Sequence, residues 1–158
     1  MINLREDTRE SIAKLTLMDD IFMNKVFEND TERTALLLRI ILNNDKIKVI
    51  KAVTQQKLKN LSGHDLHLDI LAQEENGRLF NVEVQNRSSG AAARRARYHL
   101  SLLDAHSLPK GEAYQRLPDN YVIFITQHDV LKGGLPLYHI SRKIEENNAA
   151  FADGCLLY

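Results

Sequence analysis

DLHLDILAQEENGRLFNVEVQN, residues 65–86, is the stretch that decides the fold, because it predicts two antiparallel β-strands joined by a short turn. The strands are expected over residues 65–73 and 78–86, with Glu75-Asn76-Gly77 between them. A two-residue Asn-Gly turn would set a polar side chain opposite an apolar one at every cross-strand pair. A three-residue loop, with Gly77 left-handed and forming a bulge, removes these mismatches, so we expect this register.

The expected register gives the hairpin an apolar face and a polar face. The apolar face carries Leu68, Ile70 and Ala72 opposite Val84, Val82 and Phe80, and the polar face carries Asp65, His67 and Asp69 opposite Arg87, Gln85 and Glu83. Asp69 and Glu83 thus become directly opposed, with Cβ atoms roughly 4.5–5.5 Å apart. Opposed carboxylates destabilise a sheet unless a charge compensates them, and Mg²⁺ is suited to this because it favours oxygen ligands. Relief by His67, Arg87 or solvent is the alternative, and the register alone does not decide between them.

The composition fits a single domain over residues 1–158, since 44% of the 158 residues are hydrophobic and can form a sizeable core. Lysine plus arginine equals aspartate plus glutamate at 21 each, so the formal net charge is zero and any nucleic-acid contact must come from local clusters. Cys155 has no cysteine to pair with, and no apolar run suits a signal peptide or a membrane span. We therefore expect a soluble cytoplasmic protein. The strand-like ending at residues 154–158 suggests a sequence trimmed from a longer one.

Hydrophobic periodicity predicts the remaining helices and strands. The expected helices span residues 4–15, a short polar helix that frays, 19–27, 31–43 and 90–105, and the expected strands span residues 47–54, 121–126 and 135–140. Thr31 is the expected N-cap of its helix, and residues 57–63 are expected to form a basic loop. The apolar run at residues 121–126 is typical of a central strand covered on both faces. The order of these elements predicts an α/β protein.

Several stretches of the sequence, taken together, resemble one known family. They are Asp20-Ile-Phe-Met-Asn-Lys-Val-Phe27, Leu68-Asp69-Ile70-Leu71, Asn81-Val82-Glu83-Val84-Gln85, Arg94-Arg95-Ala-Arg97-Tyr98, and Tyr121-Val-Ile-Phe-Ile125 followed by Gly133-Gly134-Leu-Pro136. Their order is similar to the D…E-x-Q core and flanking blocks of the PD-(D/E)XK nuclease superfamily. The most similar branch is the putative transposase group that includes recombination-promoting nucleases. The resemblance implies a restriction-endonuclease-like αβββαβ core, with a mixed central sheet flanked by helices.

The resemblance also implies roles for individual residues. Asp69 and Glu83 would ligate a catalytic Mg²⁺ or Mn²⁺, assisted by the carbonyl of Val84. Gln85 stands where the superfamily pattern has lysine, and would position the attacking water. A neutral amide supplies no positive charge, so any such charge must come from another residue. Asp20 matches an acidic position that some members contribute to the metal site, although it also simply favours a helix N-terminus.

Three arginines in the helix after the hairpin would bind the phosphates of DNA. These are Arg94, Arg95 and Arg97, for which a solvated helix face is the alternative. His67, beside Gln85, is the histidine that we expect to carry a proton. The leading hypothesis is a Mg²⁺-dependent DNA endonuclease linked to mobile elements or recombination. The alternatives are a weak or inactive nuclease fold that serves as a binding module, and a unit that forms a homo-oligomer through the C-terminal strand.

Overall fold

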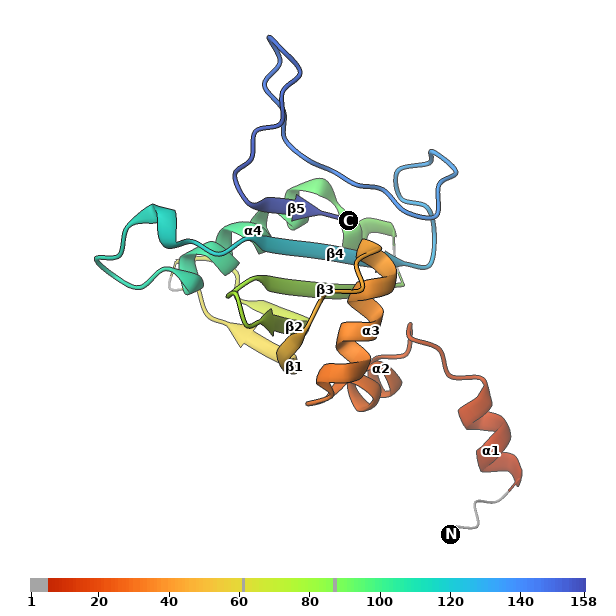
Figure 1. Ribbon diagram of the computed structural model, residues 1–158. Helices are drawn as coiled ribbons and strands as arrows, with labels where there is room; N and C mark the ends of the chain where they lie inside the picture. The colour runs from red at the N-terminus through yellow and green to blue at the C-terminus, as the bar shows by residue number, and fades with distance from the viewer. Residues whose placement is uncertain (1–5, 61, 87) are drawn as a thin grey trace.

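A mixed β-sheet forms the centre of the computed structural model, which describes residues 6–60, 62–86 and 88–158 (Figure 1). Within these ranges the sheet has five strands, in the spatial order β1-β2-β3-β4-β5. They are β1 (Val49–Leu58), β2 (Leu66–Glu74), β3 (Leu79–Gln85), β4 (Asn120–Thr126) and β5 (Cys155–Leu157). β1, β2 and β3 form an antiparallel meander, whereas β4 is parallel to both β3 and β5. The expected mixed sheet is therefore confirmed.

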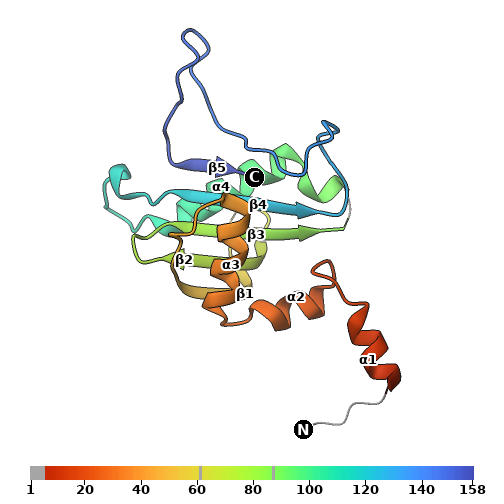
Figure 2. The ribbon, with the colours of Figure 1, turned by 45° about the vertical axis from the view of Figure 1, so that its right-hand side comes forward.

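Helices pack on both faces of this sheet, and a further helix at the N-terminal end lies apart from it. They are α1 (Glu6–Ala13), α2 (Asp20–Phe27), α3 (Thr31–Leu42) and α4 (Ala93–Ser107), with short 3₁₀ turns at Ser88–Ala91 and Tyr114–Arg116. Figures 1 and 2 show α3 in front of the sheet and α4 behind it, whereas α1 extends away from the body. Leu38 of α3 packs in one core with Ile70 and Val82, and Leu100 of α4 packs in a second core with Val122. α4 is the crossover that makes β3 and β4 parallel.

The hairpin between β2 and β3 has the register expected from the sequence. Its ladder pairs Ile70 with Val82 and Ala72 with Phe80. Gly77 has a φ of 91°, in the left-handed region that favours glycine, and its N–H donates to the carbonyl of Glu74 at 3.0 Å. Alternating apolar residues thus face one core together, which is the condition that selected this register.

Three expected boundaries are wrong. The N-cap of α3 is Asp30 rather than Thr31, because the Asp30 carboxylate accepts a hydrogen bond from the Arg33 N–H at 2.8 Å. β1 continues to Leu58, through the start of the expected basic loop, because Lys57 and Leu58 pair with the beginning of β2. The last helix begins only at Ala93, after a 3₁₀ turn.

The strand expected at residues 135–140 is also wrong. These residues are all described, and they form no strand; Ile140 makes a single isolated bridge to Leu157. Figures 1 and 2 show the chain looping away from the sheet between β4 and β5. The place beside β4 is taken by β5, which confirms the strand-like character of residues 154–158. A strand needs a neighbour for its backbone hydrogen bonds, and residues 135–140 have no such neighbour along their length.

Among the helices in the described ranges, none is both long and apolar enough to cross a lipid bilayer.

Candidate active site

Asp69 and Glu83 lie where β2 and β3 separate. The backbone ladder between the two strands ends at the pair Ile70–Val82. One residue further on, the backbone N–H groups are bound by the two carboxylates instead of by carbonyl groups of the facing strand. Asp69 Oδ2 accepts a hydrogen bond from the Val84 N–H at 2.8 Å, and Glu83 Oε1 accepts one from the Asp69 N–H at 3.3 Å. The two residues are neighbours, as the register predicts, but they are not a simple opposed pair on an exposed polar face. Each carboxylate instead satisfies an N–H of the other strand.

β1 is distorted at the same level of the sheet. Gln55 has a φ of 53°, and its place in the β1–β2 register, opposite Asp69, makes no ladder pair. A residue other than glycine in the left-handed region carries strain of order 1–3 kcal/mol, which proteins tolerate chiefly at functional sites. The strained residue of β1 therefore lies at the same point along the sheet as the two carboxylates.

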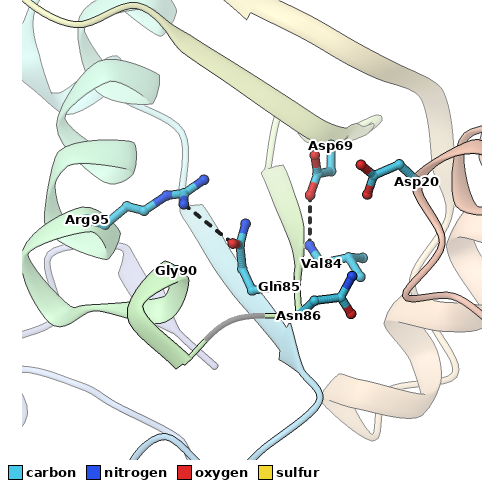
Figure 3. Close-up of a pocket in the computed structure, with 7 residues that line it drawn as sticks. All are labelled: Asp20, Asp69, Val84, Gln85, Asn86, Gly90 and Arg95. Carbon is cyan, nitrogen blue, oxygen red and sulfur yellow. Dashed lines mark hydrogen bonds between the residues drawn. The ribbon is translucent and has the colours of Figure 1, made fainter.

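A cleft of about 420 Å³ opens beside Asp69 (Figure 3). Its lining residues come from α2, β2, the end of β3, the 3₁₀ turn that follows it and the start of α4, and they are Asp20, Asp69, Val84, Gln85, Asn86, Gly90 and Arg95. The cleft thus gathers four residues singled out from the sequence: Asp20, Asp69, Gln85 and Arg95. Glu83 lies beneath the cleft with no exposed surface. Arg94 and Arg97 are exposed on α4 and do not line it, and Arg87 lies outside the described residues.

Arg95 brings a positive charge to the neutral Gln85. Its Nη1 donates to Gln85 Oε1 at 3.5 Å, the contact dashed in Figure 3. Its Nη2 lies 3.3 Å from Glu83 Oε2. Gly90 makes room for this arrangement, since a Cβ at that position would collide with the Gln85 carboxamide. A guanidinium from α4 therefore lies beside the Gln85 carboxamide and the Glu83 carboxylate.

His99, and not the His67 singled out from the sequence, is the histidine that contacts Arg95. His99 is fully buried, and its Nε2 accepts a hydrogen bond from Arg95 Nε–H at 3.2 Å. Burial, and then the charge of Arg95, lowers the pKa of His99 to about 4, so the ring is neutral at pH 7. His67 is exposed and lines a different cavity. The i,i+4 spacing of Arg95 and His99 on one helix is the sequence signal that would have found this contact.

Both carboxyl groups are harder to ionise than free ones, chiefly because they are buried. Burial, and then the charge of Asp69, raises the pKa of Glu83 to about 7, even though Arg95 is close. Burial also raises the pKa of Asp69; the hydrogen bond from Val84 opposes this rise, and the charge of Asp20 adds to it. A cation in the cleft would relieve this repulsion.

The donor atoms fit a hard divalent cation. Asp69 and Asp20 offer carboxylate oxygens to the cleft, and Mg²⁺ is commonly held by one or two carboxylates while water and substrate phosphate complete its shell. Both oxygens of Glu83 are engaged, by Asp69 and by Arg95. Within the described ranges, no group of three acidic, histidine or cysteine side chains converges tightly enough to enclose a metal. The site thus suits a metal shared with substrate better than a metal enclosed by protein.

These features define the class of protein. A mixed sheet with a parallel crossover, flanked by helices, carries an aspartate and a Glu-x-Gln motif on adjacent strands beside a polar cleft, as in a nuclease of the restriction-endonuclease-like type. The family model of the PD-(D/E)XK nuclease family transposase matches residues 9–154. The chain belongs to this family, which confirms the resemblance found in the sequence.

No curated protein and no solved structure shows a significant match. Nucleases of this type generally use divalent metals, and the family implies a DNA substrate.

Proposed function

We propose that this protein is a Mg²⁺-dependent DNA endonuclease that hydrolyses phosphodiester bonds. The observation that carries the proposal is the pairing of Asp69 and Glu83, each of which binds a backbone N–H of the other's strand at the edge of the cleft. The charges of Asp20 and Asp69 contribute to the raised pKa values of Asp69 and Glu83, and a bound cation would offset this contribution. Family membership supports the nuclease activity itself.

The proposed roles follow from the contacts of each residue. Asp69 and the exposed Asp20 would offer oxygens to Mg²⁺ or Mn²⁺ from the walls of the cleft. Glu83 would join them by exchanging one of its present partners, the Asp69 N–H or Arg95, for the cation. When bound, the cation supplies a Lewis acid for the phosphate and makes water a stronger nucleophile. Gln85 orients the attacking water through its carboxamide. Arg95 holds that carboxamide in place and favours the ionised form of Glu83.

DNA binding is proposed to rest on the arginines of α4. Arg95 faces the cleft, and the exposed Arg94 and Arg97 lie close by on the same helix. Because the whole chain has a formal net charge of zero, this cluster would supply the local attraction for phosphates, and the affinity would fall as salt is raised. The family supports a role in mobile-element or recombination functions, for which we propose a cytoplasmic setting.

A nicking assay on supercoiled plasmid DNA, titrated with Mg²⁺, tests the proposal. We expect metal-dependent nicking by the wild type and none by Glu83→Gln or Asp69→Asn. Glu75→Gln is the matched control, because Glu75 is exposed in the turn at the other end of the same hairpin. Nicking that persists unchanged in purified Glu83→Gln or Asp69→Asn would contradict the proposal.

DNA binding without cleavage is the second candidate. It is favoured by the complete burial of Glu83, whose oxygens are already engaged, and by the neutral Gln85. This function predicts metal-independent DNA binding by the wild type and no nicking with Mg²⁺ or Mn²⁺. The same assay, accompanied by a binding measurement in EDTA, separates the two candidates.

A further inference from the structure

A second cavity, of about 590 Å³, lies next to the cleft and shares one wall with it. It is formed by the start of β2, the residues just before β2, and the first turns of α4, and its lining residues are His64, Asp65, Leu66, His67, Arg94, Arg95 and Tyr98. Arg95 lines both spaces. A ligand in this cavity would therefore lie beside any phosphate held in the cleft.

The charge in this cavity suits an anion. Asp65 is already paired with Lys57, at 2.8 Å between Oδ2 and Nζ, so its carboxylate does not oppose a second negative group. Within the described part of the chain, Arg95 is paired with Glu83, whereas Arg94 takes part in no ion pair. The exposed guanidinium of Arg94 is thus available to bind a phosphate through two parallel hydrogen bonds, in bidentate geometry.

The rest of the lining combines the exposed imidazoles of His64 and His67 with two larger apolar groups, Leu66 and the ring of Tyr98. Leu66 is buried, and the partly buried Tyr98 is fixed through its hydroxyl, which donates to the His64 carbonyl and accepts from Asn60 Nδ2 at 2.8 Å. A fixed aromatic ring beside an aliphatic side chain offers a surface for the face of a nucleobase. The cationic Arg94 thus suits the phosphate of a nucleotide, and the apolar groups of Leu66 and Tyr98 suit its base.

We propose that this cavity binds one unpaired nucleotide of a DNA strand, next to the phosphate in the cleft. The base contacts Leu66 and Tyr98, and its phosphate binds Arg94. In a continuous duplex the faces of the bases are stacked and only their edges are accessible, so a base enters this cavity only when it is unpaired or flipped out. The inference rests on the proposed nuclease function and adds a substrate class to it: DNA that contains an unpaired nucleotide.

Fluorescence anisotropy in EDTA, where no cleavage occurs, tests the inference with the full chain. The probes are a short duplex with one unpaired thymidine, the same duplex fully paired, and the single strand. We expect the wild type to prefer the probes that contain an unpaired nucleotide. We expect Arg94→Ala to lose this preference and to reduce the slope of log affinity against log salt by about one. Arg97→Ala, with the same charge change on the same helix, is the matched comparison: as a general phosphate contact it should weaken binding of all three probes alike, but it should keep the preference for the unpaired nucleotide, because Arg97 does not line the cavity.

A second pair of variants separates base contact from phosphate contact. Tyr98→Leu should weaken binding of the unpaired probes about tenfold, whereas Tyr98→Phe, which keeps the ring, should retain it. Should Tyr98→Leu fail to fold, the exposed Arg94 still provides the comparison. Two results would overturn the inference while metal-dependent nicking still supports the nuclease. One is equal affinity of the wild type for paired and unpaired probes, and the other is an equal loss of the preference in Arg94→Ala and Arg97→Ala. If the protein neither binds nor nicks DNA, both the endonuclease function and the nucleotide-binding cavity are contradicted.

Discussion

Arg95 Nη2 lies 3.3 Å from Glu83 Oε2, and this ion pair connects the first turn of α4 to the strand that carries the Glu-x-Gln motif. Glu83 has no exposed surface, so Arg95 supplies its compensating charge from the cleft side. The same guanidinium reaches Gln85 and His99. Arg95 thus contacts the buried Glu83 carboxylate, the Gln85 carboxamide and the buried His99 ring at the same time.

Removal of this guanidinium should destabilise the protein at alkaline pH. We expect Arg95→Met to lower the free energy of unfolding by about 1–3 kcal/mol at pH above 7, because a buried carboxylate loses a charged partner. The loss should be smaller near pH 6, where Glu83 takes up a proton instead. Urea denaturation measures both values. Arg97→Met is the control and should change stability by no more than about 0.5 kcal/mol, since Arg97 is exposed; an equal loss in both variants would contradict the prediction.

The stability of the metal-free protein should fall as pH rises from about 6.5 to 8. Glu83 titrates near 4.5 when unfolded and near 7 when folded, so between these values the folded state binds more protons, and raising the pH favours unfolding. His99 acts in the opposite sense between about 4 and 6.5, because its folded pKa is the lower one. Above about pH 6.5 the contribution of His99 no longer changes, so the decline in stability there reports on Glu83. Melting temperatures of the wild type and Glu83→Gln test this: the variant should lose the decline, and a decline of the same size would exclude Glu83 as its cause.

Mg²⁺ should raise the melting temperature of the wild type, and more at pH 8 than at pH 6. A ligand that binds only the folded state stabilises it, and this cation needs ionised carboxylates. Because the cation competes with protons at Glu83, its affinity should increase as the pH passes about 7. Differential scanning fluorimetry with Asp69→Asn as the site variant and Glu75→Gln as the control measures this shift. A shift that survives in Asp69→Asn would show that Mg²⁺ binds elsewhere.

Restoration of the superfamily lysine should not by itself increase nicking. Gln85→Lys would place an ammonium next to the Arg95 guanidinium, which lies 3.5 Å from the Gln85 carboxamide, and like charges repel. We expect Gln85→Lys to be less active than the double variant Gln85→Lys with Arg95→Met, in which one cation replaces the other. Plasmid nicking by the four combinations measures this non-additivity. Strictly additive effects would mean that the two positions act independently.

The sequence alone determined the hairpin, because its information is local. Alternating side chains and the position of Gly77 select a single register, and the structure has that register. The same alternation brought Asp69 and Glu83 to one level of the sheet, and the order of the motifs identified the family. Local patterning was less reliable at residues 135–140, where an apolar segment lacks the neighbour that a strand requires.

Only the tertiary structure decided how the two carboxylates are used. Nothing in the hairpin sequence indicates that Glu83 is buried under α4, or that Arg95 and His99 come from that helix to meet it. These contacts depend on how α4 crosses the sheet, and so on packing between segments that are distant in sequence. The charge balance of the site follows from this packing, because burial raises the pKa of Glu83 while the guanidinium of α4 opposes the rise. The sequence located the acidic pair, and the fold determined its electrostatic environment.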